Sequence, residues 1–226
     1  MPVPTPNRSE KILDAAERAF AQFGFEGASL RDIVLEAKVN LATVYYYFGS
    51  KRGLMEAVLK RRFGPLRREQ LELLQNAQPP DPNSTLPLES ILKALLLPPL
   101  RLAVGAPAKR QAVAQLVGRI VTEPNPKTQD ILRSQHAEVR GAFLRALQDS
   151  LPEMPLPDLR WRFEFVTGAL ALILCNPRKL EKETRGACNP VDTDQVLAEM
   201  ISFFSAGFRA PAAGRFPKPV ISQPSA

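Results

Sequence analysis

The chain has 226 residues, which is enough for one large domain or two modest ones, and 45% of them are hydrophobic. Its formal net charge of +7 favours approach to nucleic acid, although a basic surface is equally compatible with a protein that is simply soluble. No apolar run reaches membrane length, and the Pro-rich N-terminus lacks the apolar core of a signal peptide. We therefore expect a cytoplasmic protein with no membrane partner.

The first helical pattern covers residues 9–23, where apolar residues such as Ile12 and Phe20 recur at helical spacing. Ser9 is a candidate N-cap, because its hydroxyl can accept a hydrogen bond from a free backbone N–H of the first turn. Gly24 follows as a candidate C-cap in the left-handed conformation. These features predict a helix that ends at Gly24.

Two shorter helices are expected next, over residues 29–48. Ser29 can cap the second helix, which is expected to end near Lys38, and Asn40 can cap the third. A three-helix unit whose last helix projects from the surface has the geometry to enter the major groove of DNA. This segment therefore predicts a helix-turn-helix.

The third helix has two different faces when its residues are placed at helical spacing. Val44, Tyr47 and Phe48 fall on one side, with Leu41 at its edge, whereas Ala42, Thr43, Tyr45 and Tyr46 point the other way and Lys51 follows. Small side chains let a helix approach base edges closely, and hydroxyl, phenol and ammonium groups can hydrogen-bond to phosphate oxygens. The outward face therefore favours contact with a polyanion over a surface helix that merely happens to carry tyrosines.

Helical patterns continue through the rest of the chain, and no alternating strand pattern of useful length occurs. A fourth helix is expected to start near Lys51, and a Pro-rich loop follows over residues 79–87. Further helices are expected over residues 88–96, where Pro98 and Pro99 interrupt the pattern, and over residues 109–121, 130–151, 159–174 and 196–208. The charged segment 176–186 is expected to be a loop, and the Pro-rich tail 210–226 is expected to be disordered. The fold class is therefore predicted to be all-α.

The last two helices are unusually apolar for a chain of this size. Their stripes comprise Phe163, Val166, Leu170 and Leu174 in one helix and Val196, Met200, Phe203 and Phe204 in the other. Part of these stripes must be ordinary core, but two such helices cannot both hide every apolar face within a single chain. Pairing with the same helices of a second copy would bury the rest. These residues are therefore the predicted dimer interface.

The sequence gives little support to a metal site, a cofactor or an enzyme. His136 is the only histidine, and Cys175 and Cys188 are the only cysteines, so neither a histidine-rich site nor a zinc cluster is expected. A disulfide between the two cysteines stays open, but reduced thiols are expected in a cytoplasmic protein. No glycine-rich phosphate loop or nucleophile elbow follows a strand, so we expect no catalytic residue and no cofactor.

Residues 8–63 resemble the DNA-binding domain of the TetR family of bacterial transcriptional regulators. The matching pieces are ILDAA at 12–16, FAQFGF at 20–25, ASLRDI at 28–33 and TVYYYFGSK at 43–51, in the order and spacing of the family. The chain departs from the family at Lys38, where glycine is usual. If that backbone is left-handed, lysine costs roughly 1 kcal/mol relative to glycine. The added charge could also reach a phosphate.

This resemblance implies a set of DNA contacts in and around the helix-turn-helix. Ser29 and Lys51 are expected to hold phosphates at the starts of the second and fourth helices. Leu41, Ala42 and Thr43 are the candidates for base contact, since apolar groups suit a thymine methyl. Tyr45, Tyr46 and Tyr47 are expected to divide between phosphate contact and packing against the first helix, and Arg31 and Asn40 complete the predicted set.

A second resemblance involves the C-terminal half. Segments 123–126, 151–155 and 159–163, together with VNLA at 39–42, are similar to a subgroup of the family that responds to long-chain fatty acids. This implies a small apolar effector, such as a fatty acid or an acyl derivative. A carboxylate head group would need an arginine such as Arg119 or Arg140. The sequence does not show which arginine turns inward, so the ligand-binding residues stay unassigned.

These features predict a homodimer with a helix-turn-helix DNA-binding domain over residues 6–66, a helical ligand-binding and dimerisation domain over 67–209, and a tail over 210–226. The expected function is ligand-responsive repression through a palindromic operator on double-stranded DNA. Two alternatives stay open. One is a sequence-independent DNA-binding protein, and the other is a helical small-molecule-binding protein without operator specificity.

Overall fold

The computed structural model describes residues 7–81, 84–104, 114, 116–118, 125–175, 177–190 and 192–211. The helices are α1 (Arg8–Gly27), α2 (Leu30–Ala37), α3 (Leu41–Phe48), α4 (Lys51–Asn76), α5 (Leu88–Val104), α7 (Pro126–Ser150), α8 (Leu156–Cys175), α9 (Pro177–Glu183) and α10 (Thr193–Arg209). Every regular element in the described residues is a helix, which confirms the all-α fold class. None of these helices combines the length and the apolar character that a membrane crossing needs.

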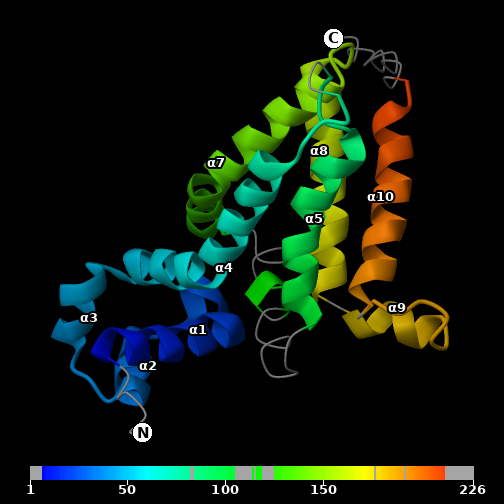
Figure 1. Ribbon diagram of the computed structural model, residues 1–226. Coiled ribbons are helices and arrows are strands. Elements are labelled where there is room, and N and C mark those ends of the chain that lie inside the picture. The colour runs from blue at the N-terminus through cyan, green and yellow to red at the C-terminus, as the bar shows by residue number, and fades with distance from the viewer. Residues whose placement is uncertain are drawn as a thin grey trace, which may run out of the picture.

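The helices form two groups that α4 connects (Figure 1). At one end, α1, α2 and α3 surround the start of α4, whereas α5, α7, α8 and α10 make up the other end. The α4 helix bends along its length, and Pro65 lies inside it. Proline explains a bend because it lacks the N–H for one helical hydrogen bond and its ring crowds the preceding turn.

Each group of helices has its own hydrophobic core. The first core includes Phe20, Ile33, Val44 and Leu59, and the second includes Leu92, Phe143, Leu159 and Val166. Two residues from the C-terminal half, Leu116 and Ile131, pack into the first core, so the two groups share an apolar interface. The α4 helix supplies residues to both cores, and the domain boundary after residue 66 stays a prediction.

The first helix differs from expectation at both of its ends. It begins at Arg8 after Asn7, so Ser9 lies inside the first turn and is not the cap. Gly24 has a positive φ of 70°, as expected, but its ψ of −176° is extended. Because this conformation only kinks the chain, helical turns resume and continue to Gly27.

Two helices of the C-terminal half extend beyond their expected limits. The α5 helix continues through Pro98 and Pro99 to Val104, and both prolines are buried. Packing around these prolines therefore maintains the helix, although neither proline has the N–H for a helical hydrogen bond. The α7 helix begins at Pro126, where Oδ1 of Asn125 accepts hydrogen bonds from the first turn.

The charged segment expected to be a loop contains the short helix α9. Cys175 and Cys188 are free thiols in the structure. Of the helix expected over 109–121, only residues 114 and 116–118 are described, and these are helical. The tail beyond residue 211 lies outside the described residues.

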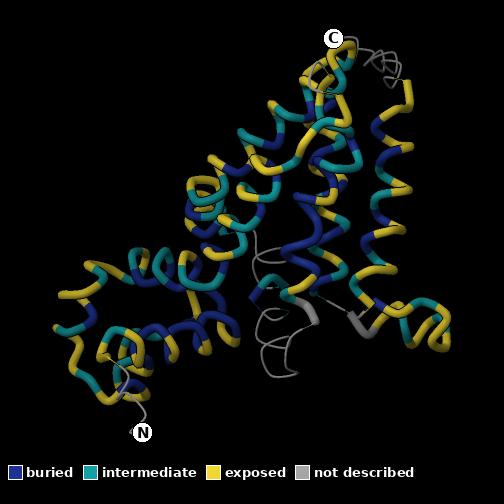
Figure 2. The backbone as a smooth tube through the Cα atoms, in the orientation of Figure 1, coloured by how far each residue is buried: buried dark blue, intermediate teal, exposed yellow. Residues whose placement is uncertain are grey.

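Buried and exposed stretches alternate along the helices of the C-terminal half (Figure 2), and the predicted dimer residues divide into two sets. Phe163, Val166, Leu170, Leu174 and Met200 are buried in the core of the single chain, and their assignment to a dimer interface stays a prediction. Val196 and Phe204 are partly buried against the same core, whereas Phe203 is 73% exposed. The α8 helix also carries a second apolar stripe that sequence reasoning overlooked. Its members Trp161, Phe165 and Leu172 are all exposed.

Candidate nucleic-acid interface and ligand cavity

Two capping side chains determine where α2 and α3 begin. The Oγ of Ser29 accepts a hydrogen bond from the backbone N of Arg31 at 3.2 Å, and the Oδ1 of Asn40 accepts one from the backbone N of Thr43 at 2.8 Å. Both predicted caps are therefore confirmed. Between them, Lys38 adopts the left-handed conformation, with φ 55° and ψ 47°. The turn thus contains a lysine at a position where glycine would be unstrained.

The outer face of α3 carries the phenols and small side chains that its helical spacing predicted. Val44 is fully buried beneath the helix, whereas Tyr46 is 83% exposed and Tyr45 is 50% exposed. Leu41 and Ala42 are also exposed at the start of the helix. This combination leaves one face of α3 open along its whole length.

Tyr47 was expected on the inner face but is exposed. Its ring lies edge-on against Tyr46, with 5.2 Å between the ring centroids, and it also leans on Phe48. Its ring therefore packs on these two neighbouring side chains of α3 instead of entering the core. Tyr47 therefore adds to the exposed phenol surface.

The hydroxyl of Thr43 is only partly free to bind DNA. Its Oγ1 donates a hydrogen bond to Oδ1 of Asn40 at 2.6 Å, and this is the oxygen that caps the helix. The bond uses the single hydroxyl hydrogen, which leaves the oxygen as an acceptor. Thr43 can therefore accept from a base N–H, whereas donating to a phosphate would break its bond to Asn40.

Lys51 lies at the start of α4, but its ammonium group is turned toward the end of α1. The Nζ donates to the carbonyl oxygen of Glu26 at 3.1 Å and lies 5.1 Å from the centroid of the Phe25 ring. Burial is the main cause that lowers the pKa of Lys51, and the charge of Glu26 opposes this shift. An ammonium has three N–H donors, so the bond to Glu26 leaves others available for a phosphate.

The junction between α3 and α4 depends on two residues that sequence reasoning missed. The Oγ of Ser50 accepts a hydrogen bond from the backbone N of Gly53 at 3.0 Å and so caps α4. A Cβ atom added to Gly53 would lie 2.1 Å from the carbonyl oxygen of Phe48. Only glycine therefore permits this close approach. A serine just before a helix is a recognisable capping signal, but no sequence pattern predicts that Gly53 lies so close to the carbonyl oxygen of Phe48.

Glu26, a third residue that the sequence did not single out, connects the helix-turn-helix to the C-terminal half. Its Oε1 accepts hydrogen bonds from Nδ2 of Asn125 and Nζ of Lys127, both at 3.1 Å. The bond from Asn125, followed by that from Lys127, lowers the pKa of Glu26. Farther along α7, the side-chain amide of Gln135 donates to the carbonyl oxygen of Glu56 in α4 at 2.8 Å. The α7 helix therefore binds both α1 and α4.

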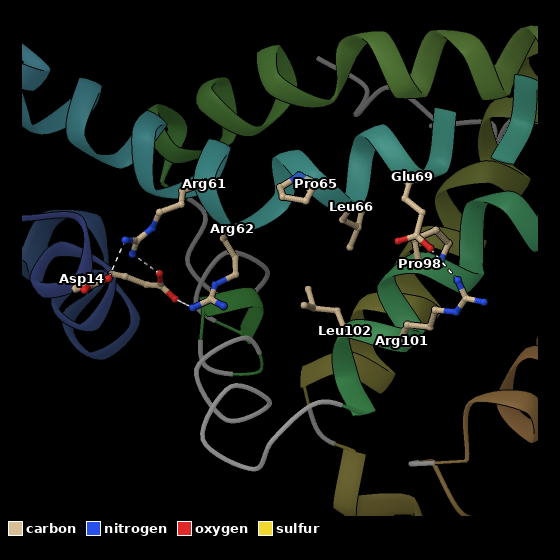
Figure 3. Close-up of a pocket in the computed structure, with 10 residues that line it drawn as sticks. Asp14, Arg61, Arg62, Pro65, Leu66, Glu69, Pro98, Arg101 and Leu102 are labelled. Atoms are coloured by element: carbon tan, nitrogen blue, oxygen red, sulfur yellow. Dashed lines mark hydrogen bonds and ion pairs between the residues drawn. The ribbon is translucent and has the colours of Figure 1, made fainter. Parts of the chain in front are cut away.

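Arg61 and Arg62 of α4 point toward α1 (Figure 3). Arg61 binds Asp14 at 2.7 Å, Glu17 at 2.8 Å and Glu10 at 3.1 Å, and Arg62 pairs with Glu17. These two arginines of the fourth helix are therefore paired with acidic residues that are distant in the sequence. Beside them a groove of about 490 Å³ opens between α1, α4 and α5.

The C-terminal half contains a mainly apolar cavity of about 410 Å³, which lies within the usual size range of small-molecule sites. Among the described residues, its polar lining consists of Gln70, His136, Thr167 and the ion pair of Arg140 with Glu164. Arg140 is one of the two arginines that the sequence suggested as partners for a ligand carboxylate. It lines the cavity, where it is paired with Glu164. Arg119 lies outside the described residues.

Two models of known families match the chain. Residues 12–58 match the model of the bacterial regulatory proteins of the tetR family. Residues 93–207 match the model of the tetracyclin repressor-like C-terminal domain.

Relatives and solved structures resemble different lengths of the chain. It is 49% identical over 47 residues to a probable HTH-type transcriptional regulator of Bacillus subtilis, YttP, covering 21% of this chain and 23% of YttP. It is 44% identical over 57 residues to the nicotine-responsive repressor HdnoR of Paenarthrobacter nicotinovorans, covering 25% of this chain and 29% of HdnoR. The matches thus span about a quarter of the length of these relatives.

A regulator of known structure resembles most of the chain. FadR from Bacillus subtilis, solved in complex with stearoyl-CoA, gives a TM-score of 0.56 at 16% identity, covering 85% of this chain and 97% of that chain. At this identity the likeness shows the fold alone.

Proposed function

The chain belongs to the TetR family of bacterial regulatory proteins, a regulatory and not an enzymatic family, and we propose that it is a homodimeric repressor of a palindromic operator, released by a small apolar effector. The observation that carries this proposal is the open outer face of α3. Asn40 caps the start of α3, and Ser50 caps the helix that follows, so the face is held at both ends. A rigid, exposed helix of this kind suits insertion into the major groove.

The proposed DNA contacts follow from what each side chain has free. Ala42 and Leu41 present apolar groups to base edges, and Thr43 presents an acceptor. Tyr45, Tyr46 and Tyr47 donate phenol hydrogens to phosphates, and Arg31 and Lys51 supply positive charge beside them. Ser29 and Asn40 contribute through the helix starts that they cap, where backbone N–H groups attract phosphate.

A second copy of the chain is the proposed partner of the exposed apolar stripe on α8 and α10. Trp161, Phe165 and Leu172 form this stripe on α8, and Phe203 extends it on α10. Burial of such apolar surface favours association by about 25 cal/mol per Å². A two-fold dimer would present two α3 helices, and half-sites about 34–36 Å apart would place both in major grooves on one side of the duplex.

The cavity and α7 support a response to a ligand. Leu132, His136 and Val139 of α7 line the cavity, while the start of the same helix binds Glu26. A ligand that moves α7 therefore changes the position of the DNA-contacting face. The neighbour FadR was solved with stearoyl-CoA, and we take a fatty acid or an acyl derivative as the starting class of effector.

Binding to genomic fragments at fixed salt tests the proposal. A regulator prefers its operator over unrelated DNA by at least about 10³. A sequence-independent DNA-binding protein would show a strong salt dependence and no such preference. A small-molecule-binding protein without operator specificity would bind the effector and no DNA.

A substitution on α3 sharpens this test. Tyr46→Ala should lower operator affinity by about tenfold or more, since a hydrogen bond to a charged group contributes about 1.5–3 kcal/mol. Because Tyr46 is so exposed, folding and dimerisation should not change. Leu180→Ala, on the exposed surface of α9, is the control and should keep full affinity. Unchanged operator binding by the Tyr46 variant would contradict the assignment of α3.

A further inference from the structure

The polar side chains of the cavity determine which effector it can bind. Gln70, His136 and Thr167 each have a hydrogen-bond partner within the chain. A ligand can use only what those bonds leave free. The donors and acceptors that remain free on these described side chains therefore indicate which groups of an effector they can bind.

His136 presents a hydrogen-bond acceptor to the cavity. Its Nδ1 lies 2.9 Å from the carbonyl oxygen of Leu132. A carbonyl can only accept, so Nδ1 carries the hydrogen and Nε2 has the free lone pair. Burial is the main cause that lowers the pKa of His136, the bond to Leu132 opposes it, and the charge of Arg67 adds to it. The ring is therefore neutral at pH 7.

Thr167 and Gln70 leave mostly acceptors as well. The Oγ1 of Thr167 donates its single hydrogen to the carbonyl oxygen of Phe163 at 3.1 Å. The Nε2 of buried Gln70 donates to the carbonyl oxygen of Leu95 at 2.6 Å, which leaves Oε1 and one N–H. The three polar side chains thus offer three acceptors and a single spare donor.

The described lining holds no unpaired charge. Arg140 and Glu164 are its only permanently charged side chains, and their charged groups lie 2.6 Å apart. The guanidinium of Arg140 also lies over the ring of Phe163, 5.7 Å from its centroid. Both side chains are about half exposed, at 45% and 48%, and a guanidinium has five N–H donors, so this pair does not decide the charge of the ligand.

Arg67 is a further cation near His136. Its Nη2 donates to Oε1 of Gln135 at 3.1 Å, and its Nη1 is buried without a hydrogen-bond partner. It is absent from the described cavity lining, so the hydrogen-bonding group that the lining itself offers on this side is the ring of His136.

Building on the proposed function, we propose that the effector is a mainly apolar molecule whose hydroxyl or N–H group donates a hydrogen bond to Nε2 of His136. This narrows the starting class to molecules that carry a hydrogen-bond donor. The apolar lining takes the hydrocarbon part. Each buried CH₂ group contributes about 0.8 kcal/mol of affinity without setting specificity.

Three probes that share a ten-carbon chain allow the contributions of different head groups to be compared. 1-Decanol has a donor, methyl decanoate has only acceptors, and decanoate carries a negative charge. Calorimetric titration of the full-length protein at pH 7.5 should show 1-decanol binding about fivefold more tightly than the ester, as expected for one hydrogen bond. Decanoate has no hydrogen to donate at pH 7.5, so it should also bind more weakly than 1-decanol.

Substitution of His136 tests whether this preference arises at Nε2. His136→Phe should lower the affinity for 1-decanol by about fivefold and leave that for methyl decanoate within about twofold. His136→Gln, which keeps an acceptor, should retain part of the preference. Circular dichroism checks the fold of both variants. If the Phe variant does not fold, the Gln variant alone tests whether the preference depends on His136.

Several results would overturn the inference. These are decanoate binding as tightly as 1-decanol, equal affinities for alcohol and ester, an unchanged preference in the Phe variant, or no binding of any probe. The titrations contain no DNA, so a failure of operator binding does not affect them. If 1-decanol binds with the expected preference but releases no operator, the cavity chemistry stands and the proposed ligand response fails.

Discussion

The ammonium nitrogen of Lys127 lies 3.1 Å from Oε1 of Glu26, and this contact joins the first turn of α7 to the last turn of α1. The carbonyl oxygen of Glu26 in turn accepts a hydrogen bond from Lys51 at the start of α4. Glu26 therefore contacts both α7, which lines the cavity, and α4, which follows the DNA-contacting helix α3. Movement of α7 would be transmitted through Glu26.

Replacing Glu26 with Gln should weaken this link and leave α3 intact. The amide can still accept from Asn125, but it loses the charge that attracts Lys127. We expect operator affinity to stay within about threefold, because exposed ion pairs contribute little. The effector concentration for half-release should rise by about threefold or more. Anisotropy of labelled operator measures both quantities, with exposed Glu153→Gln as the control. A normal effector response in the Glu26 variant would show that the signal takes another path.

Gly53 should tolerate no side chain. Its Cβ would meet the carbonyl oxygen of Phe48, so Gly53→Ala must push α3 away from α4. We expect a loss of about 1–3 kcal/mol in the free energy of unfolding, as for other overpacked sites, together with weaker operator binding. Gly64→Ala in the same helix is a matched control, because its Cβ finds ordinary contacts and alanine favours helix by about 0.5–1 kcal/mol. Urea unfolding of both variants measures the difference, and equal stabilities would refute the steric argument.

Local signals predicted α2 and α3 because caps and helical spacing depend on sequence neighbours. Ser29 and Asn40 act on residues two and three positions away. The contact of Glu26 with Lys127 joins residues 101 positions apart, and no local pattern announces it.

The α8 helix shows a different limit of sequence reasoning. Both of its stripes are apolar, so spacing alone cannot tell which of them faces the core. Packing against α5, α7 and α10 selects the stripe that contains Val166. The stripe that contains Phe165 stays exposed.

Glu17 should be the most sensitive member of the charge cluster between α1 and α4. Its side chain is only 9% exposed and pairs with both Arg61 and Arg62. Glu17→Gln would leave two partly buried cations without their shared counter-charge, so we expect a loss of about 1–3 kcal/mol in the free energy of unfolding. Glu10→Gln, at the exposed edge of the same cluster, should lose less than about 1 kcal/mol. Urea titrations at constant salt compare them, and equal losses would contradict a special role for burial.

His136 should make the protein less stable as the pH falls. Its pKa is lowered in the folded chain, mainly by burial, so the unfolded chain binds a proton first. The stability is fully present above the unfolded pKa of about 6.5 and is lost as the pH falls through the folded value. His136→Phe should therefore show a smaller drop in melting temperature between pH 7 and pH 5 than the wild type. A drop of the same size would mean that other groups, such as the paired carboxylates, account for the acid sensitivity.

Phe203 should be essential for the proposed dimer and dispensable for the fold of one chain. Its ring is exposed and meets Phe204 edge-on, with 5.3 Å between the centroids, so Phe203→Glu removes no buried contact of the core. In a dimer the new carboxylate would be buried without a partner, which is strongly unfavourable. We expect sedimentation to show monomers with an unchanged helical spectrum. Operator affinity should fall by about 100-fold or more, since each monomer then binds a single half-site without the benefit of linkage. Leu180→Glu places the same charge on an exposed leucine of α9 and should leave the dimer intact. If the Phe203 variant sediments as the wild type does, the second copy must associate through another surface.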